Sequence, residues 1–168
     1  IDFNAAYSVE VGSLGKLSAN VVGTYTDKFT VDNGISQTYD CVGYYGSNCS
    51  NLNGTPTAPT PKWRHNARLS LATPGGVGLS VQWRHFGSVS DEATQTTNAT
   101  VGGNAVPFSS KLAAQNYFDL STSFRFADKF SFRLGVNNIF DKEPPLVVSG
   151  AGAYTNSCPT GPCNGNTY

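Results

Sequence analysis

The stretch YFDLSTSFRFADKFSFRLGVNNIFD, residues 117–141, decides how the rest of the sequence is interpreted. Apolar and polar residues alternate up to the short segment Ala127-Asp128-Lys129, and the alternation resumes directly after it. The apolar phase contains Phe118, Leu120, Phe124, Phe126, Phe130, Phe132, Leu134 and Val136, and the polar phase contains Asp119, Ser121, Ser123, Arg125, Ser131, Arg133 and Asn137. A period of two on both sides of a tight turn predicts a β-hairpin with one apolar face and one polar face.

Two kinds of protein use such a hairpin. A soluble sandwich buries the apolar face against a second sheet, whereas an outer-membrane barrel exposes it to lipid and keeps the polar face around a water-filled lumen. Each arm runs about ten residues, close to the length that a tilted strand needs to cross a bilayer. The aromatic residues Phe124, Phe126 and Phe130 gather beside the short turn, where a barrel carries an interfacial girdle. These features favour the barrel.

The same alternation predicts four more strands and a regular order of connections. The strands are expected at Asp2–Val9, Lys16–Thr26, Trp63–Leu71 and Val77–His85, with an extension of the second to about Val31. Short connectors near Gly12, Pro74 and Asp128 alternate with long polar loops at residues 32–61, 90–111 and 143–168. Bacterial outer-membrane barrels show this asymmetry between their two ends. We therefore predict an all-β fold, an antiparallel up-and-down meander of about six long strands.

Composition agrees with that fold and argues against several functions. Charged residues make up 13% of the chain, against roughly 25% in ordinary soluble domains, and aromatic residues make up 12%. Lys and Arg together number 11, as do Asp and Glu, so the net charge indicates no nucleic-acid partner. No window approaches the length of about 18 apolar residues that marks a membrane helix. The chain contains no Met and begins within a strand pattern, which predicts a segment of a longer polypeptide.

The four cysteines form two close pairs in the sequence. Cys41 and Cys49 lie in the first long loop, and Cys158 and Cys163 lie in the last. Four cysteines allow three connectivities, of which pairing within each loop is favoured because the partners are near one another. Neither pair has the ligand spacing of a zinc site. Disulfides would place these loops in an oxidising compartment.

Three sets of residues are candidates for a site, and each also has a plainer explanation. Trp63 and Trp83 are expected at the interface opposite the short turns, as an outer aromatic belt. His65 and His85 share that region, and interfacial packing is favoured over metal binding because no third ligand accompanies them. Arginines at polar positions suit an anion-attracting lining or ordinary charge pairing, which is favoured, for example with Asp119 on a neighbouring strand. These arginines are Arg64, Arg68, Arg84, Arg125 and Arg133.

Residues 134–142, LGVNNIFDK, resemble the C-terminal NLFD signature of TonB-dependent outer-membrane receptors. The signature positions are Asn137, Asn138, Ile139, Phe140 and Asp141, and Ile139 stands where the family more often has Leu. Residues 116–120, NYFDL, are also typical of the family. Strand termination explains Asn138 and Asp141 better than a binding site does, because Asn and Asp favour turns. The resemblance implies that residues 1–168 are an open C-terminal segment of a 22-stranded transmembrane barrel, without the plug domain and the final strand.

The resemblance also implies a function and a set of partners. The function is TonB-energised uptake of a scarce, bulky nutrient, such as a ferric siderophore, across the outer membrane of a Gram-negative cell. The expected partners are membrane lipid, the plug and remaining strands of the same chain, the TonB complex through the N-terminal region, and the small-molecule nutrient, with no nucleic acid. We expect no enzyme activity, no catalytic or metal-binding residue and no cofactor. Ligand contacts would lie in the loops at 32–61 and 90–111, where no single residue stands out.

Two other functions are left open by the sequence. The first is a passive, porin-like outer-membrane barrel without energy coupling. The second is a secreted, disulfide-bonded β-sandwich that binds carbohydrate or protein. A sandwich would seal Phe118, Leu120, Phe132 and Leu134 inside a two-layer core and would be a soluble monomer without detergent.

Overall fold

The structure is a computed structural model of the 168-residue chain. It describes residues 1–32, 34, 38–46, 49, 51–52, 55–56, 59–91, 100–101, 104–105, 111–126, 129–147 and 163–164. Contacts divide the chain into two compact units, which we describe separately. The first comprises Ile1–Thr24, Arg64–His85 and Asn116–Lys142, and the second comprises Tyr25–Trp63, Phe86–Gln115 and Glu143–Tyr168.

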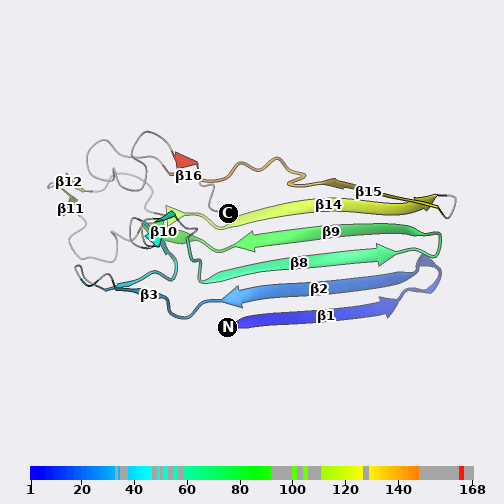
Figure 1. Cartoon of the computed structure of the whole chain (residues 1–168), viewed down its shortest axis with the longest axis horizontal. Coiled ribbons are helices and arrows are strands. Elements are labelled where there is room, and N and C mark those ends of the chain that lie inside the picture. Colours follow the sequence, from blue (N-terminus) through cyan, green and yellow to red (C-terminus); the bar gives the residue numbers. More distant parts are fainter. Residues whose placement is uncertain are drawn as a thin grey trace. The chain divides into compact units, whose positions relative to one another are not determined.

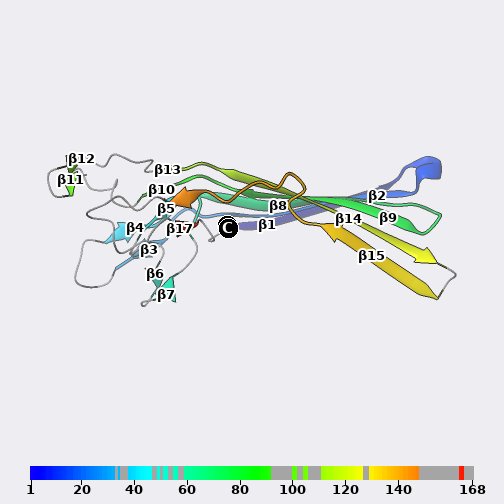
Figure 2. The same cartoon turned by 90° about the horizontal axis from the view of Figure 1, so that it is seen from above.

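The first unit is built on a six-stranded sheet whose strands are neighbours in chain order (Figure 1). The strands are β1 (Asp2–Glu10), β2 (Lys16–Tyr25), β8 (Trp63–Ala72), β9 (Val77–Phe86), β14 (Gln115–Phe126) and β15 (Phe130–Val136). They form one twisted layer (Figure 2), with β1 and β15 at its two edges, so the sheet is not closed. The predicted all-β fold with an antiparallel meander of six long strands is confirmed.

In the β1–β2 and β14–β15 hairpins, the register keeps the apolar phase together. Phe124 lies opposite Phe132 in the β14–β15 pair, and Phe126 lies opposite Phe130. In the β1–β2 pair, Phe3 lies opposite Gly23. A Cβ atom at Gly23 would approach the Phe3 ring to 2.3 Å, so this ring lies directly over the glycine. Because side chains alternate between faces, this register puts most polar residues of each hairpin on the opposite face, with Thr122 opposite Leu134 as an exception.

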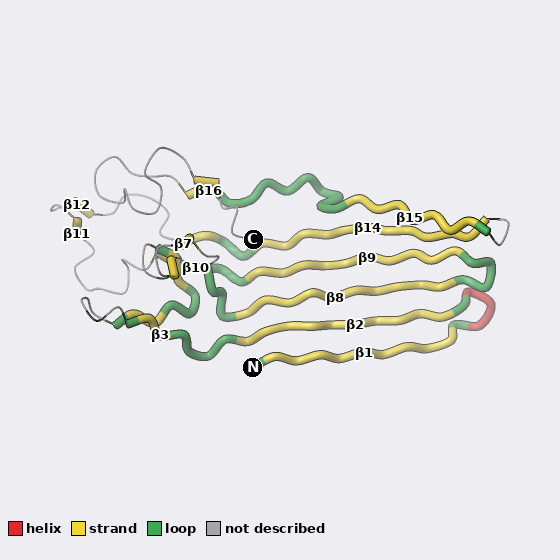
Figure 3. Tube along the Cα trace, viewed as in Figure 1, coloured by secondary structure: helices red, strands yellow, loops and turns green. Residues whose placement is uncertain are grey.

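The short turns are formed by the residues that the sequence singles out. Between β1 and β2, a 3-10 turn, η1 (Gly12–Leu14), ends at Gly15. Gly15 has a φ of 105°, a backbone angle that glycine adopts at low cost and other residues do not. Thr73 closes the turn between β8 and β9, because its N–H donates to the carbonyl oxygen of Val77 at 2.8 Å. Figure 3 shows both connections at the same end of the sheet.

The last strand ends earlier than expected. The sequence suggests arms of about ten residues, but β15 spans seven and stops at Val136. Asn138 and Asp141 then adopt positive φ angles of 54° and 47°, which turn the chain out of the strand. The Asn138 side chain holds this turn, since its Oδ1 accepts the N–H of Lys142 and its Nδ2 donates to the Lys142 carbonyl oxygen, both at 3.0 Å.

The second unit contains short ladders where the sequence predicts long loops. Strand β10 (Val89–Asp91) pairs with β5 (Tyr44–Tyr45) and β13 (Lys111–Leu112), and Tyr45, Val89 and Leu112 form a small buried cluster between them. The predicted extension of the second strand to Val31 is wrong, because β2 ends at Tyr25. Two-residue ladders join β3 (Thr30–Val31) to β4 (Tyr39–Asp40), β6 (Asn51–Leu52) to β7 (Thr55–Pro56), β11 (Thr100–Val101) to β12 (Asn104–Ala105), and β16 (Leu146–Val147) to β17 (Cys163–Asn164).

Candidate functional site

The two faces of the six-stranded sheet have opposite character. On the apolar face, Leu120, Phe132 and Leu134 are exposed to 44%, 48% and 61% of their surface. Burying a side chain of this size stabilises a protein by about 1.5–3 kcal/mol, so a soluble sandwich would cover them. The face does not form a sealed two-layer core, and the chemistry of this unit lies on the other side of the sheet.

An ion pair organises the polar face. The guanidinium of Arg84 donates from Nε to Asp119 Oδ2 at 2.8 Å and from Nη2 to Asp119 Oδ1 at 2.9 Å. The backbone N–H of Asn138 also donates to Asp119 Oδ1, at 2.8 Å. The Arg84 guanidinium lies 5.3 Å from the centre of the Tyr117 ring, a cation–π contact. The predicted pairing of Asp119 with an arginine of a neighbouring strand is confirmed.

Beside this ion pair the polar face has a hollow of about 240 Å³. Its floor is made of small residues: the hydroxyls of Ser80 and Ser121 are hydrogen-bonded at 2.7 Å, and Gly135 lies opposite Ser121. Arg68 and Arg133 are among the larger residues that line it. A second hollow of about 250 Å³ shares Ser80, Ser121 and Arg133 with the first. We define the first hollow as the candidate site.

The five arginines predicted on this face do not share one environment. Within the described residues, Arg84 is the only one in an ion pair with a carboxylate. Arg68 donates from Nη2 to Gln82 Oε1. Arg68 and Arg133 line the hollow, whereas Arg64 and Arg125 do not. The sequence analysis does not predict the hollow. The signal that could have indicated it is the set of small residues at polar positions, Ser80, Ser121 and Gly135.

Trp83, which the sequence predicts together with Trp63 for an outer aromatic belt, lies in a connected group of rings. Its ring meets that of His65 edge to face at 4.5 Å and lies parallel to that of Phe118 at 6.1 Å. Trp83 Nε1–H donates to Asn116 Oδ1 at 2.9 Å, and His85 Nδ1 lies 2.8 Å from the same oxygen. Because an amide oxygen only accepts hydrogen bonds, the contact with His85 requires the tautomer that has its proton on Nδ1.

The two histidines pack on each other. Their rings stack at 5.0 Å between centroids with an interplanar angle of 23°. Within the described ranges, no group of three or more His, Cys, Asp or Glu residues could hold a metal ion. The sequence singles out both histidines but does not indicate that Asn116 contacts Trp83 and His85, because that contact depends on the pairing of β9 with β14.

The remaining aromatic positions are placed as follows. The rings of Phe124 and Phe132 stack at 5.3 Å beside the turn between β14 and β15, and Phe130 is exposed. Trp63 begins β8 and is also exposed. The Phe126 side chain lies outside the described part of the structure.

The signature residues form the turn that follows β15. Asn137 lines the hollow, and Asn138 links the turn to Asp119. Ile139 donates its N–H to the carbonyl oxygen of Phe118 at 2.8 Å, and the Phe140 ring meets that of Phe118 at 5.6 Å. Strand termination therefore accounts for Asn138, as the sequence suggests.

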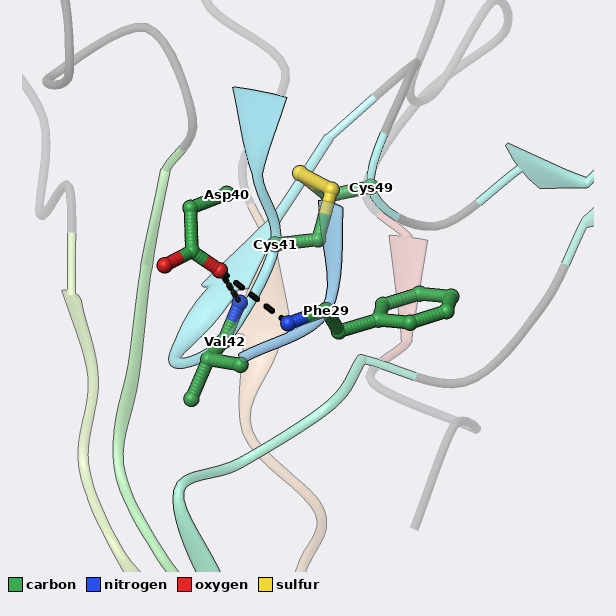
Figure 4. Close-up of a disulfide and its surroundings, with 5 residues drawn as sticks. All are labelled: Phe29, Asp40, Cys41, Val42 and Cys49. Atoms are coloured by element: carbon green, nitrogen blue, oxygen red, sulfur yellow. Dashed lines mark hydrogen bonds between the residues drawn. A yellow bond between two sulfur atoms is a disulfide. The ribbon is translucent and has the colours of Figure 1, made fainter. Parts of the chain in front are cut away.

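A disulfide joins Cys41 to Cys49 in the second unit, with an S–S distance of 2.07 Å and a Cα–Cα distance of 5.0 Å (Figure 4). Pairing within the first loop is confirmed for these two cysteines. The Asp40 carboxylate holds the segment, since Oδ1 accepts the N–H of Phe29 at 3.3 Å and that of Val42 at 3.2 Å. For the predicted bond between Cys158 and Cys163, Cys158 and the side chain of Cys163 lie outside the described part of the structure.

Comparison with protein-family models, with curated proteins and with solved structures finds no match to this chain. In the described ranges, no helix is long and apolar enough to cross a membrane.

Proposed function

We propose that this chain forms part of the wall of an outer-membrane β-barrel, within a TonB-dependent receptor that takes up a scarce, bulky nutrient such as a ferric siderophore. One observation carries the proposal: a single-layered sheet exposes its apolar face and keeps a hydrogen-bonded, charged network on the other. A transmembrane barrel needs this arrangement, because lipid contacts one face of its wall and water contacts the other.

Strand length and connectivity support the same environment. Strands β8 and β9 have ten residues each and β14 has twelve, against the roughly 9–11 that a tilted strand needs to cross a bilayer. Consecutive strands are neighbours throughout the sheet, as in up-and-down barrels. The edges at β1 and β15 would be paired by further strands of the barrel, because lipid cannot satisfy open backbone groups. A closed barrel of 22 strands would supply them.

In this proposal the chain contributes wall and loops to the receptor. The rings around Trp83 and those of Phe124 and Phe132 mark two levels along the strands, as two interfacial girdles would. The nutrient would meet the loops and the plug, and energy from the TonB complex would move the plug. The chain would lie in the outer membrane of a Gram-negative cell and would act without catalysis or cofactor.

Uptake measurements test this function. A cell that makes the protein is compared with one that lacks it, under iron limitation, with a panel of ferric siderophores as iron source. We expect at least one siderophore to support growth only when both the protein and TonB are present. Growth that needs the protein but continues without TonB would favour the passive porin, and equal growth with and without the protein on every siderophore would contradict uptake of this kind.

Solubility separates the barrel from the secreted sandwich. The exposed Leu120, Phe132 and Leu134 predict that the protein aggregates in water and becomes monodisperse only in detergent. Size-exclusion chromatography with and without a neutral detergent checks this. A monomer without detergent that melts sharply would favour the sandwich.

A further inference from the structure

We propose that the hollow lined by Arg68 and Arg133 binds an oxyanion, a carboxylate or phosphate group carried by a small solute. This inference deepens the proposed function and rests on it in one respect, namely that the polar face lines a water-filled interior. Three properties of the hollow favour an oxyanion: its charges, its space and its free hydrogen-bond donors.

The charges around the hollow favour a negatively charged occupant. Three guanidiniums and one carboxylate surround the hollow and its adjoining ion pair, those of Arg68, Arg84, Arg133 and Asp119. Asp119 is already matched by two hydrogen bonds from Arg84 and one from the N–H of Asn138. Arg68 and Arg133 also line the hollow, and neither forms an ion pair with a carboxylate among the described residues. Asp119 lies near enough to interact with Arg68 electrostatically, so two positive charges lining the hollow exceed the one nearby carboxylate that Arg84 already pairs. Guanidiniums bind carboxylate and phosphate groups with paired, charge-assisted hydrogen bonds.

The hollow also has room for an occupant and a hydroxyl group that can donate a hydrogen bond to it. Ser80, Ser121 and Gly135 are small, so an occupant can approach the backbone of the sheet between the longer side chains. The hydroxyls of Ser80 and Ser121 share one hydrogen bond, which uses only one of their two O–H groups. The other O–H is left to donate to an occupant. Gln82 Oε1 accepts from Arg68 and so steadies that guanidinium.

These features select an anion over other solutes. A cation would meet the guanidiniums of Arg68 and Arg133, neither of which has an ion-pair partner among the described residues, and a neutral solute would leave both without one. The volume of about 240 Å³ admits a group larger than phosphate itself, such as a small polycarboxylate. We therefore choose inorganic phosphate and citrate as probes.

Calorimetric titration of the whole protein in neutral detergent tests the site. We expect saturable binding of one or both probes, weakened about tenfold by Arg68→Gln and about tenfold by Arg133→Gln. The matched controls are Arg64→Gln and Arg125→Gln, which remove the same charge from the same face outside the hollow. Each control should change the dissociation constant less than about twofold, because neither side chain lines the hollow and salt screens exposed charges that do not contact the bound group.

A second pair of variants keeps both arginines in place. A Cβ at Gly135 would lie 3.6 Å from Leu120 O and from Ser121 Cβ, which is ordinary contact, so a side chain fits there. Gly135→Glu supplies a carboxylate of the chain itself and should abolish probe binding. Gly135→Gln, of nearly equal size and no charge, should weaken binding far less.

Three results would overturn the inference. The first is the absence of saturable binding of either probe up to about 10 mM. The second is equal loss in the Arg64 and Arg125 controls, which would indicate diffuse attraction by the whole face. The third is equal behaviour of Gly135→Glu and Gly135→Gln. Uptake and lipid accessibility decide the proposed function separately, so a barrel that fails these titrations keeps its function and loses only this site.

Discussion

At the scale of single residues, Asp119 connects the two segments on which the family resemblance rests. It belongs to the stretch 116–120, and its carboxylate accepts the N–H of Asn138 in the stretch 137–141. The same carboxylate binds Arg84 on β9. One side chain thus joins the end of β15 to two other strands, which gives it a structural role that neither segment indicates alone.

Removing this carboxylate tests that role. We expect Asp119→Ala to lower the free energy of unfolding by about 2–3 kcal/mol, because three hydrogen bonds are lost and Arg84 is left half-buried without its partner. Asp119→Asn keeps an acceptor and should cost less. Denaturant titration of the folded protein in lipid vesicles measures both. A cost below about 0.5 kcal/mol for Asp119→Ala would show that the network does not stabilise the sheet.

Single residues also show where sequence interpretation reaches its limit. The alternation assigns faces correctly to Leu120 and Arg133, since a period of two follows from the backbone alone. The sequence suggests that Asn138 ends the strand but does not show what holds the turn, because the N–H of Asn138 is bound by Asp119, which is distant in the sequence. The sequence also does not predict the hollow, because Ser80 and Gly135 line it together only through the register of three strands.

At the scale of elements, the two faces of β8 should respond oppositely to the same substitution. Leu69 lies on the apolar face and is 51% exposed, and Ser70 follows it on the polar face. If lipid contacts the apolar face, Leu69→Lys should cost about 2 kcal/mol and Ser70→Lys less than about 1 kcal/mol. Denaturant titration in vesicles gives both values. Equal costs would mean that water contacts both faces.

The disulfide is expected to act on the second unit only. Breaking a loop of this length costs about 2–3 kcal/mol at most, and the Cys41–Cys49 bond lies beside the short ladders of that unit. In the Cys41→Ser, Cys49→Ser double variant, amide exchange should quicken at Tyr45 and Val89. Exchange in the six-stranded sheet should stay as in the parent protein. Faster exchange throughout the sheet would contradict independent behaviour of the two units.

At the scale of the whole molecule, the sequence predicted the order and pairing of the long strands because both follow from local patterns. Short turns at Gly12–Leu14 and Thr73 force neighbouring strands to be antiparallel. The ladders within the long connections were not predicted, because strands of two or three residues carry no measurable period. The disulfide pairing at Cys41 followed from proximity in the sequence.

The central claim is that the apolar face of the sheet contacts acyl chains and the polar face contacts water. The most direct test places a nitroxide label at one residue at a time along β14, in protein reconstituted into lipid vesicles. Its collision rates with oxygen, which concentrates in lipid, and with a water-soluble nickel chelate are then compared. We predict strict alternation, with oxygen dominant at Leu120 and Phe124 and the chelate dominant at Ser121 and Ser123. Equal access of the chelate to both sets, or labels at Leu120 and Phe124 shielded from both reagents, would contradict the claim.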